Sequence, residues 1–198
     1  MQTVHGMMNR AIQCFLQDTY GQAFWARVVD GAGLDFDSFE AMLAYEYTQT
    51  DAVLTAAAEC LQEPRDMLLE DLGTYLVSHP HTQAIRRLLR FGGATFLEFL
   101  YSLDELPDRA RLALPELIFP SLELEGHDAT RFTLRVSHEV PGFGHVMVGI
   151  LRALADDYGA LVLLDHGGRR AETETVSIEL AAAAFSEGRR FELREQAT

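Results

Sequence analysis

Residues 86–121 read RRLLRFGGATFLEFLYSLDELPDRARLALPELIFPS, the most informative segment of the chain for its fold. Phe96, Phe99, Leu100 and Leu103 recur at steps of three and four residues, so they lie on one face of a helix. This spacing predicts a helix over 94–106. Pro107 follows at once and is expected to end that helix, because proline lacks the N–H that a continuing helix needs.

The sequence before this stretch predicts helices alone. Amphipathic or capped patterns cover 7–19, 22–32, 51–61 and 82–91, and a further helix follows Pro64 and runs through residue 76. Ser38 is expected to cap a short helix that reaches residue 43, and Thr50 to cap the helix over 51–61. The segment His79-Pro80-His81 separates two of these helices.

The sequence after residue 117 changes period. Alternating apolar and polar residues, or short apolar runs, are typical of strands and occur over 118–125, 131–137, 160–165 and 174–180. Helical spacing of apolar residues returns over 143–158. Gly167-Gly168 is expected to form the turn between the last two strands. The predicted class is α+β, a single domain over 1–198 with a helical lobe over about 1–110 and a sheet-containing lobe over about 111–198.

Composition bounds the possible functions. The 198 residues are 48% hydrophobic, enough for one globular core, and carry a formal net charge of −14. This acidity argues against binding to nucleic acid and to anionic membrane surfaces. No signal peptide or membrane span is visible, and Cys14 and Cys60 belong to no metal-binding pattern, so a cytoplasmic protein is expected. No pattern of a known catalytic motif occurs, so we expect no enzyme activity.

The ordered series of elements resembles the haem–nitric oxide/oxygen-binding (H-NOX) domain, the sensor module of bacterial gas-sensing proteins and of soluble guanylate cyclase. In that family a helix reads F-L-x-x-L-D-x-L-H, its histidine ligates the haem iron, and Y-P-x-x-x-x-P begins seven residues later. Here Leu114-Pro115 and Pro120 fall in that register, which places Pro107 at the position of the iron ligand. Proline has no nitrogen lone pair for iron. His79, His81 and Tyr101 are the alternative ligands nearest in sequence.

The resemblance also implies a propionate clamp, Y-x-S-x-R, near the second strand of the sheet. The nearest match is Arg135-x-Ser137-x-Glu139, in which the tyrosine and the arginine of the clamp are both replaced. A register shifted by one residue gives Val136, His138 and Val140. An arginine can hold a carboxylate through two hydrogen bonds, whereas a glutamate repels it.

The resemblance places Met8 and Ile12 on the distal wall of the haem pocket, and Pro120 at a proline that presses on the macrocycle. Without haem, the larger side chains Phe91, Phe96 and Phe99 are candidates to fill that space.

Two functions remain open from the sequence. The first is a regulatory module with the sensor fold, without haem b, that acts through a histidine kinase or a cyclic-nucleotide enzyme. The second is a true haem sensor of nitric oxide or oxygen with unusual iron ligation. His138 and His145, with Glu139, form a weak metal candidate, and the acid pairs Asp104-Glu105 and Asp156-Asp157 are expected to be solvated.

Overall fold

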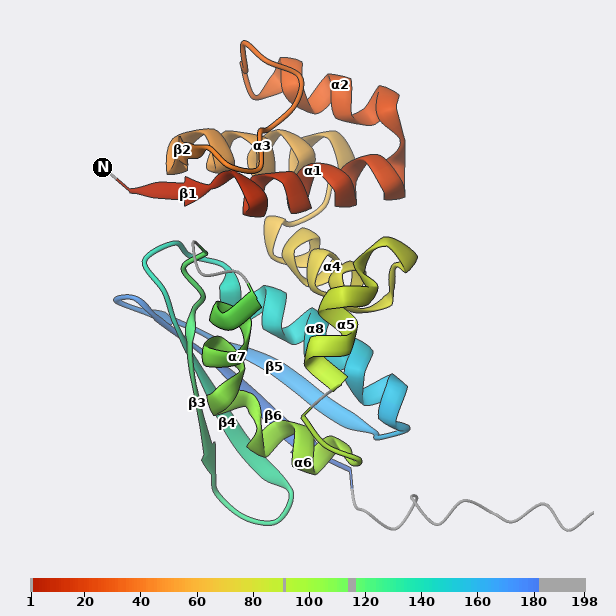
Figure 1. Cartoon of the computed structure of the whole chain (residues 1–198), viewed down its shortest axis with the longest axis vertical. Coiled ribbons are helices and arrows are strands. Elements are labelled where there is room, and N and C mark those ends of the chain that lie inside the picture. The colour runs from red at the N-terminus through yellow and green to blue at the C-terminus, as the bar shows by residue number, and fades with distance from the viewer. Residues whose placement is uncertain (1, 91, 114–116, 182–198) are drawn as a thin grey trace, which may run out of the picture.

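A computed structural model describes residues 2–90, 92–113 and 117–181 of the chain (Figure 1). Helices α1 to α4 form its first part, with a short antiparallel pair of strands, β1 and β2, beside them. The bounds are β1 Thr3–His5, α1 Gly6–Tyr20, α2 Gln22–Gly31, β2 Ala44–Glu46, α3 Tyr47–Leu61 and α4 Arg65–Ser78.

The second part combines helices with a four-stranded antiparallel sheet of order β3-β4-β6-β5. Short helices precede this sheet, and the long helix α8 follows its strand β4 in sequence. The bounds are η1 Pro80–Thr82, α5 Gln83–Arg90, α6 Phe96–Tyr101, η2 Leu103–Glu105, α7 Leu106–Ala113, β3 Ser121–Gly126, β4 Arg131–Ser137, α8 Phe143–Tyr158, β5 Val162–Arg170 and β6 Thr173–Leu180. The arrangement confirms the α+β prediction.

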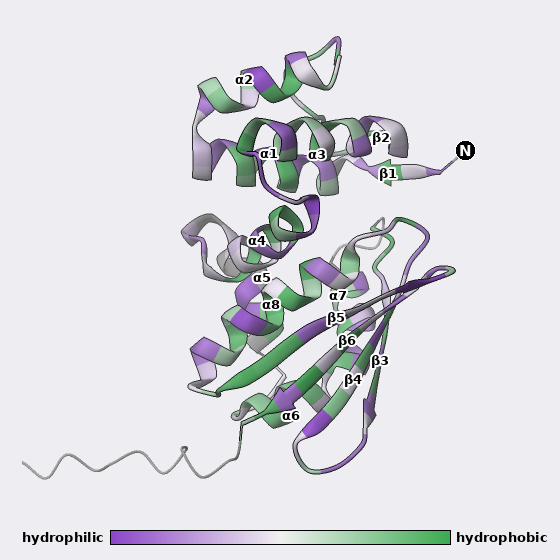
Figure 2. Ribbon diagram, turned by 180° about the vertical axis from the view of Figure 1, so that it is seen from behind, coloured by the Kyte–Doolittle hydropathy of each residue, from purple (hydrophilic) through white to green (hydrophobic). Residues whose placement is uncertain are grey.

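The buried hydrophobic side chains of the described residues form two cores. The first lies among α1 to α4 and includes the buried Trp25 and Phe15. The second lies between the sheet and the helices on one of its faces, and includes Phe99, Phe132 and Leu151. Figure 2 shows hydrophobic residues along α8 and along the strands that it faces. The second core also includes Leu89 of α5 and Phe96 and Leu100 of α6, so these two helices, which the sequence grouped with the helical lobe, pack with the sheet.

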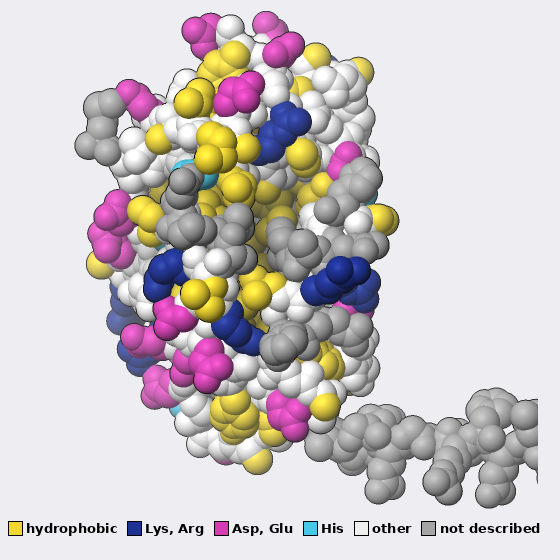
Figure 3. Space-filling view, viewed as in Figure 1, with side chains coloured by type: hydrophobic (Ala, Val, Ile, Leu, Met, Phe, Trp, Pro, Cys, Tyr) yellow, Lys and Arg dark blue, Asp and Glu magenta, His cyan; other side chains and the backbone are white. Residues whose placement is uncertain are grey.

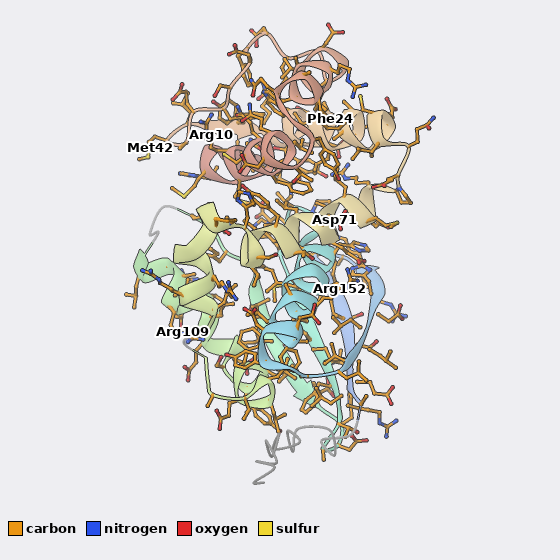
Figure 4. All side chains as sticks on the ribbon, turned by 90° about the vertical axis from the view of Figure 1, so that its right-hand side faces the viewer. Arg10, Phe24, Met42, Asp71, Arg109 and Arg152 are labelled. Carbon is orange, nitrogen blue, oxygen red and sulfur yellow. The ribbon has the colours of Figure 1, made fainter. Side chains whose placement is uncertain are left out.

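Helices α4 and α8 join the two parts where two glycines let their backbones approach closely. A Cβ atom on Gly149 would lie 1.8 Å from the carbonyl oxygen of Glu70, and one on Gly73 would lie 2.1 Å from that of Val146. Arg152 on α8 donates to Glu70 on α4 at 2.7 Å beside this crossing. In Figure 4, Asp71 marks α4 and Arg152 marks α8 at the crossing.

The helix expected over 94–106 is shorter than predicted. It begins at Phe96 with a capping box between Thr95 and Glu98, and it ends at Tyr101. A 3₁₀ turn then leads into α7, in which Pro107 is the second residue. Proline has no backbone N–H, so Pro107 could not donate the hydrogen bond to the residue 103 carbonyl that a continuous helix would need. Proline suits the first turn of a new helix, where the N–H has no partner within the helix.

Three local predictions were also wrong. The described backbone at 38–43 turns without forming a helix, and the Ser38 hydroxyl accepts a hydrogen bond from Arg10 instead. Helix α3 begins at Tyr47, so Thr50 lies inside it and donates to Asn9 rather than capping. The last two strands turn at residues 171–172, and Gly167-Gly168 lie in a bulge of β5.

Candidate functional site

An apolar cavity of about 290 Å³ lies where the helical part meets the part that contains the sheet. Figure 3 shows hydrophobic side chains around a hollow in the middle of this face of the molecule. The described lining residues come from β1, α1, α3, α4, α5, α7, β3 and α8, from the segment before β3 and from the segment after β4. They are Val4, Met7, Met8, Ala11, Ile12, Thr50, Leu54, Leu69, Leu72, Leu76, Leu88, Leu89, Leu106, Pro107, Ala110, Leu117, Ile118, Phe119, Pro120, Leu122, Val140, Pro141, Gly142, Phe143, Val146, Met147 and Ile150.

The structure brings four of the predicted site residues together at this cavity. Met8 and Ile12 line it from one face of α1, because residues four apart lie one above the other on a helix. Pro107 lines it from the first turn of α7, and the buried Pro120 lines it just before β3. Residues 12 and 107 are far apart in sequence, so only the fold brings them to one site.

The lining is almost free of polar groups. None of the described lining residues is Asp, Glu, Lys, Arg or His. Thr50 is the polar side chain among them, and its hydroxyl already donates to Asn9 Oδ1 at 2.7 Å. Water needs two to four polar partners in a cavity, so this space is poorly suited to ordered water.

The apolar walls of this cavity face one another across open space. A bound apolar molecule would remove this surface from water and would thereby stabilise the folded chain.

The clamp residues do not line the cavity. Arg135 is exposed on β4 and pairs with Glu125 at 2.8 Å, and the hydroxyls of Ser137 and Thr173 lie 2.8 Å apart. Glu139 is exposed after the strand. The alternate register faces inward instead, since Val136 is buried in the core and Val140 lines the cavity.

The alternative iron ligands are also placed elsewhere. His79 stacks on Tyr75 with ring centroids 4.6 Å apart and lies 3.6 Å from Asp18, outside the cavity lining. Tyr101 is 61% exposed and packs edge-on against Phe132. The His81 side chain lies outside the described part of the structure.

The aromatic residues proposed as fillers do not all reach this space. Phe96 and Phe99 are buried in the core beneath the sheet, with ring centroids 5.9 Å apart, and neither lines the cavity. Phe91 lies outside the described residues. Neither Phe96 nor Phe99 therefore fills the cavity.

The lining residues that sequence reasoning missed include residues of α4, α7 and α8. Met147 and Ile150 follow the same helical spacing that identified α8, and Ala110 follows Pro107 by one turn. The helical periodicity of the sequence could have placed the lining residues of each helix on one face of that helix. It could not have shown that the lining faces of α4, α7 and α8 meet at one cavity.

A polar cluster lies next to the cavity, at the start of α8. The imidazoles of His145 and His166 stack with ring centroids 3.7 Å apart. The buried Glu174 accepts hydrogen bonds from the Gly142 and Gly144 backbone amides at 2.6 and 2.7 Å, and its Oε2 atom lies 3.2 Å from His166 Nε2. The carboxylate thus satisfies backbone amides at the start of α8.

The pKa of Glu174 reflects this setting. Burial alone would raise the pKa of its carboxyl. The hydrogen bonds from the two backbone amides and the contact with His166 outweigh burial, so the pKa lies below its ordinary value. Glu174 is therefore held as a carboxylate at neutral pH.

The other weak candidates have structural contacts. In the described residues, no group of three or more His, Cys, Asp or Glu side chains is arranged to hold a metal. Asp157 accepts hydrogen bonds from Arg86 at 2.7–3.0 Å, and Asp104 accepts one from the Leu124 amide at 2.8 Å. Cys14 and Cys60 are half-buried free thiols.

A model of the family described as HNOB, haem-NO-binding, matches residues 5–166. The chain belongs to the haem-NO-binding family. A domain of this family is a sensor rather than a catalytic domain. The match covers most of the described chain, including strands β3 and β4 and every described lining residue of the cavity except Val4.

Curated relatives share this region at low identity. The chain is 25% identical over 154 residues to soluble guanylate cyclase gcy-31 of Caenorhabditis elegans, a match of 78% of this chain and 22% of that protein. It is 22% identical over 158 residues to soluble guanylate cyclase 89Da of Drosophila melanogaster, a match of 80% of this chain and 24% of that protein. The chain thus spans about a quarter of the length of these relatives.

Solved H-NOX structures share the fold. The K. algicida H-NOX protein, described as Fe(II) unliganded, matches with a TM-score of 0.73 and 14% identity over 90% of this chain and 97% of that one. An H-NOX protein from S. oneidensis in the Fe(II)NO ligation state matches with a TM-score of 0.72 and 14% identity, over 90% of this chain and 100% of that one.

Across 2–90, 92–113 and 117–181, no helix has both the length and the apolarity needed to cross a bilayer.

The residues described around the cavity do not fit a histidine-ligated haem. No His, Cys or Tyr side chain is among them, and no basic side chain is present to hold a propionate. Met7, Met8 and Met147 line the space, but a methionine at haem iron in proteins typically accompanies a histidine. The cavity keeps apolar walls without the polar contacts that fix the cofactor.

Proposed function

We propose that this chain is a sensory or regulatory module of the haem-NO-binding family that works without the family's histidine-ligated haem. The observation that carries the proposal is the lining of the cavity around Pro107. The sequence resemblance assigns this residue to the position of the iron ligand, and its ring lines the cavity with no lone pair to offer. The described lining supplies no histidine, cysteine or tyrosine in its place.

The missing propionate contacts support the same proposal independently. Haem carries two carboxylates, and each would need a basic or hydroxyl partner to leave water without a penalty of several kcal/mol. Arg135 is exposed and already paired with Glu125, and Glu139 has the wrong charge. One lost contact could be compensated locally, whereas the loss of the contacts to both iron and propionates leaves little to fix the cofactor.

The proposed output is binding to a separate signalling protein in the cytoplasm, such as a histidine kinase or a cyclic-nucleotide enzyme. The soluble guanylate cyclases that match it are about four times longer than the matched region, so the chain corresponds to one part of them. With a net charge of −14, the chain favours a partner with a basic surface. Such binding should weaken as salt rises.

The first test is an absorption spectrum. The full chain is expressed with added haem precursor, and a purified haem-binding member of the family is prepared in parallel as the positive control. We expect no stoichiometric Soret band from this chain. A one-to-one haem complex with an iron–nitrogen or iron–sulfur ligand seen by resonance Raman spectroscopy would overturn the proposal and establish a haem sensor with unusual ligation.

The second test concerns the signal. Co-purification of the candidate kinase or cyclase is compared at low and high salt, with and without a nitric oxide donor. We expect capture that falls with salt and does not respond to nitric oxide. Capture that depends on nitric oxide would return the protein to the gas-sensor class.

A further inference from the structure

We propose that the cavity between the two parts of the chain binds an uncharged, apolar small molecule of about two fused or linked rings, or an alkyl chain of similar volume. This inference rests on the proposed function, because a haem would occupy the same space. It goes further by naming the chemistry of the molecule that takes that place.

The charge of the occupant follows from the lining. A charged group that entered the cavity would lose its water and meet no ionised partner among the described walls. Thr50 offers a hydroxyl, but that hydroxyl is already committed to the buried Asn9. A carboxylate or an ammonium is therefore disfavoured, whereas a hydrocarbon surface matches every other described wall.

The size of the occupant follows from the volume. An apolar engineered cavity of about 150 Å³ stays dry and binds benzene. The cavity here, at about 290 Å³, is roughly twice as large.

The walls have the plasticity that an apolar ligand needs. Met7, Met8 and Met147 are part of the cavity lining, and methionine side chains adapt to the shape of a ligand because they are unbranched and flexible. The cavity is bounded by both α1 and α8, so an occupant would contact both hydrophobic cores at once. Its binding should therefore stabilise the whole chain.

The test uses a matched pair of probes, biphenyl and biphenyl-4-carboxylate, on the full purified chain at neutral pH. Thermal unfolding is followed at increasing concentrations of each probe, because a ligand that binds the folded state raises Tm in a saturable way. We expect biphenyl to raise Tm and the carboxylate to have little effect. Equal effects of the two probes, or none from either, would overturn the inference.

Two variants locate the binding. Ala110→Phe inserts a ring into the cavity from α7 and should abolish the response to biphenyl, whereas Ala26→Phe, on the exposed side of α2, should retain it. Should Ala110→Phe fail to unfold cooperatively, Ala11→Leu makes a smaller insertion from α1. Extraction of gel-filtered protein should then recover one biphenyl per chain from the Ala26→Phe variant and none from the filled variant. Equal recovery from both would refute the assigned site.

The haem spectrum keeps the two proposals apart. A chain that takes up neither haem nor biphenyl contradicts this inference and leaves the proposed function standing. A chain that binds haem stoichiometrically and does not respond to biphenyl contradicts both.

Discussion

The close crossing of α4 and α8 makes Gly149→Ala a sharp test of the packing between the two parts of the chain. The new methyl group would lie 1.8 Å from the Glu70 carbonyl oxygen and 2.8 Å from the Thr74 backbone nitrogen. Both are backbone atoms, so no change of side-chain rotamer relieves the contact, and the helices must move apart. Overpacking of this kind typically costs about 1–3 kcal/mol, and the upper end applies here.

Part of that cost is offset inside the helix. Alanine is a better helix former than glycine by about 1 kcal/mol. The expected net loss is therefore ~2 kcal/mol, from ~3 kcal/mol of overpacking less the gain in propensity. For a chain of 198 residues this corresponds to a fall in Tm of about 4–8 °C.

The assay is urea unfolding followed by far-UV circular dichroism, with Gly126→Ala as the matched control. A Cβ atom on Gly126 would meet only the Phe132 ring, at 3.6 Å, which is an ordinary contact. The control should stay within about 0.5 kcal/mol of the wild type. If Gly149→Ala is as stable as the control, the close approach of α4 and α8 does not describe the molecule in solution.

Three further outcomes are expected. Glu174→Gln should lower the free energy of unfolding by roughly 1–3 kcal/mol at pH 7, because a buried carboxylate that accepts backbone hydrogen bonds is lost. The pKa of Glu174 is lower in the folded than in the unfolded chain, so the difference in stability between wild type and variant should be present above the ordinary pKa of Glu and shrink as pH falls through the lowered folded pKa. Urea titrations from pH 7 to 3 measure this difference, and a difference independent of pH would contradict the reasoning. Phe99→Ala should cost about 3–5 kcal/mol in the same assay, since Phe99 is 0% exposed in the core beneath the sheet, and a loss below about 1 kcal/mol would show that this core collapses around the gap. Pro107→His should give weak haem uptake by absorption titration, and more than Leu112→His on the exposed side of the same helix; tight binding by Pro107→His alone would show that the missing propionate contacts do not matter.

Much of the fold was predictable because its signals are local. The ranges predicted for α8 and β4 from their hydrophobic periodicity match the observed bounds, because long amphipathic runs with clear ends leave few alternatives. Two of the local predictions that were wrong involve polar residues with distant partners. Ser38 and Thr50 look like helix caps in sequence, but their hydroxyls bond instead to Arg10 and Asn9, which lie 28 and 41 residues away.

The site was predictable only in part. Met8, Ile12, Pro107 and Pro120 line one cavity, and their roles toward a haem stay predictions. The clamp positions depended on register along β4, and a shift of one residue in a strand moves every side chain to the opposite face. The stack of His145 on His166 joins α8 to β5, and no pattern in the sequence could indicate it.

The two cores give the chain a built-in optical reporter. The chain has a single tryptophan, Trp25, which is 1% exposed in the core of α1 to α4 and donates to the Asp37 carbonyl oxygen at 2.7 Å. Its emission therefore reads the helical core alone, whereas far-UV circular dichroism reads the helices and strands of both parts. Coincident transitions by the two probes would mean that the parts unfold as one cooperative unit, and separate transitions would give each part its own stability without a single added label.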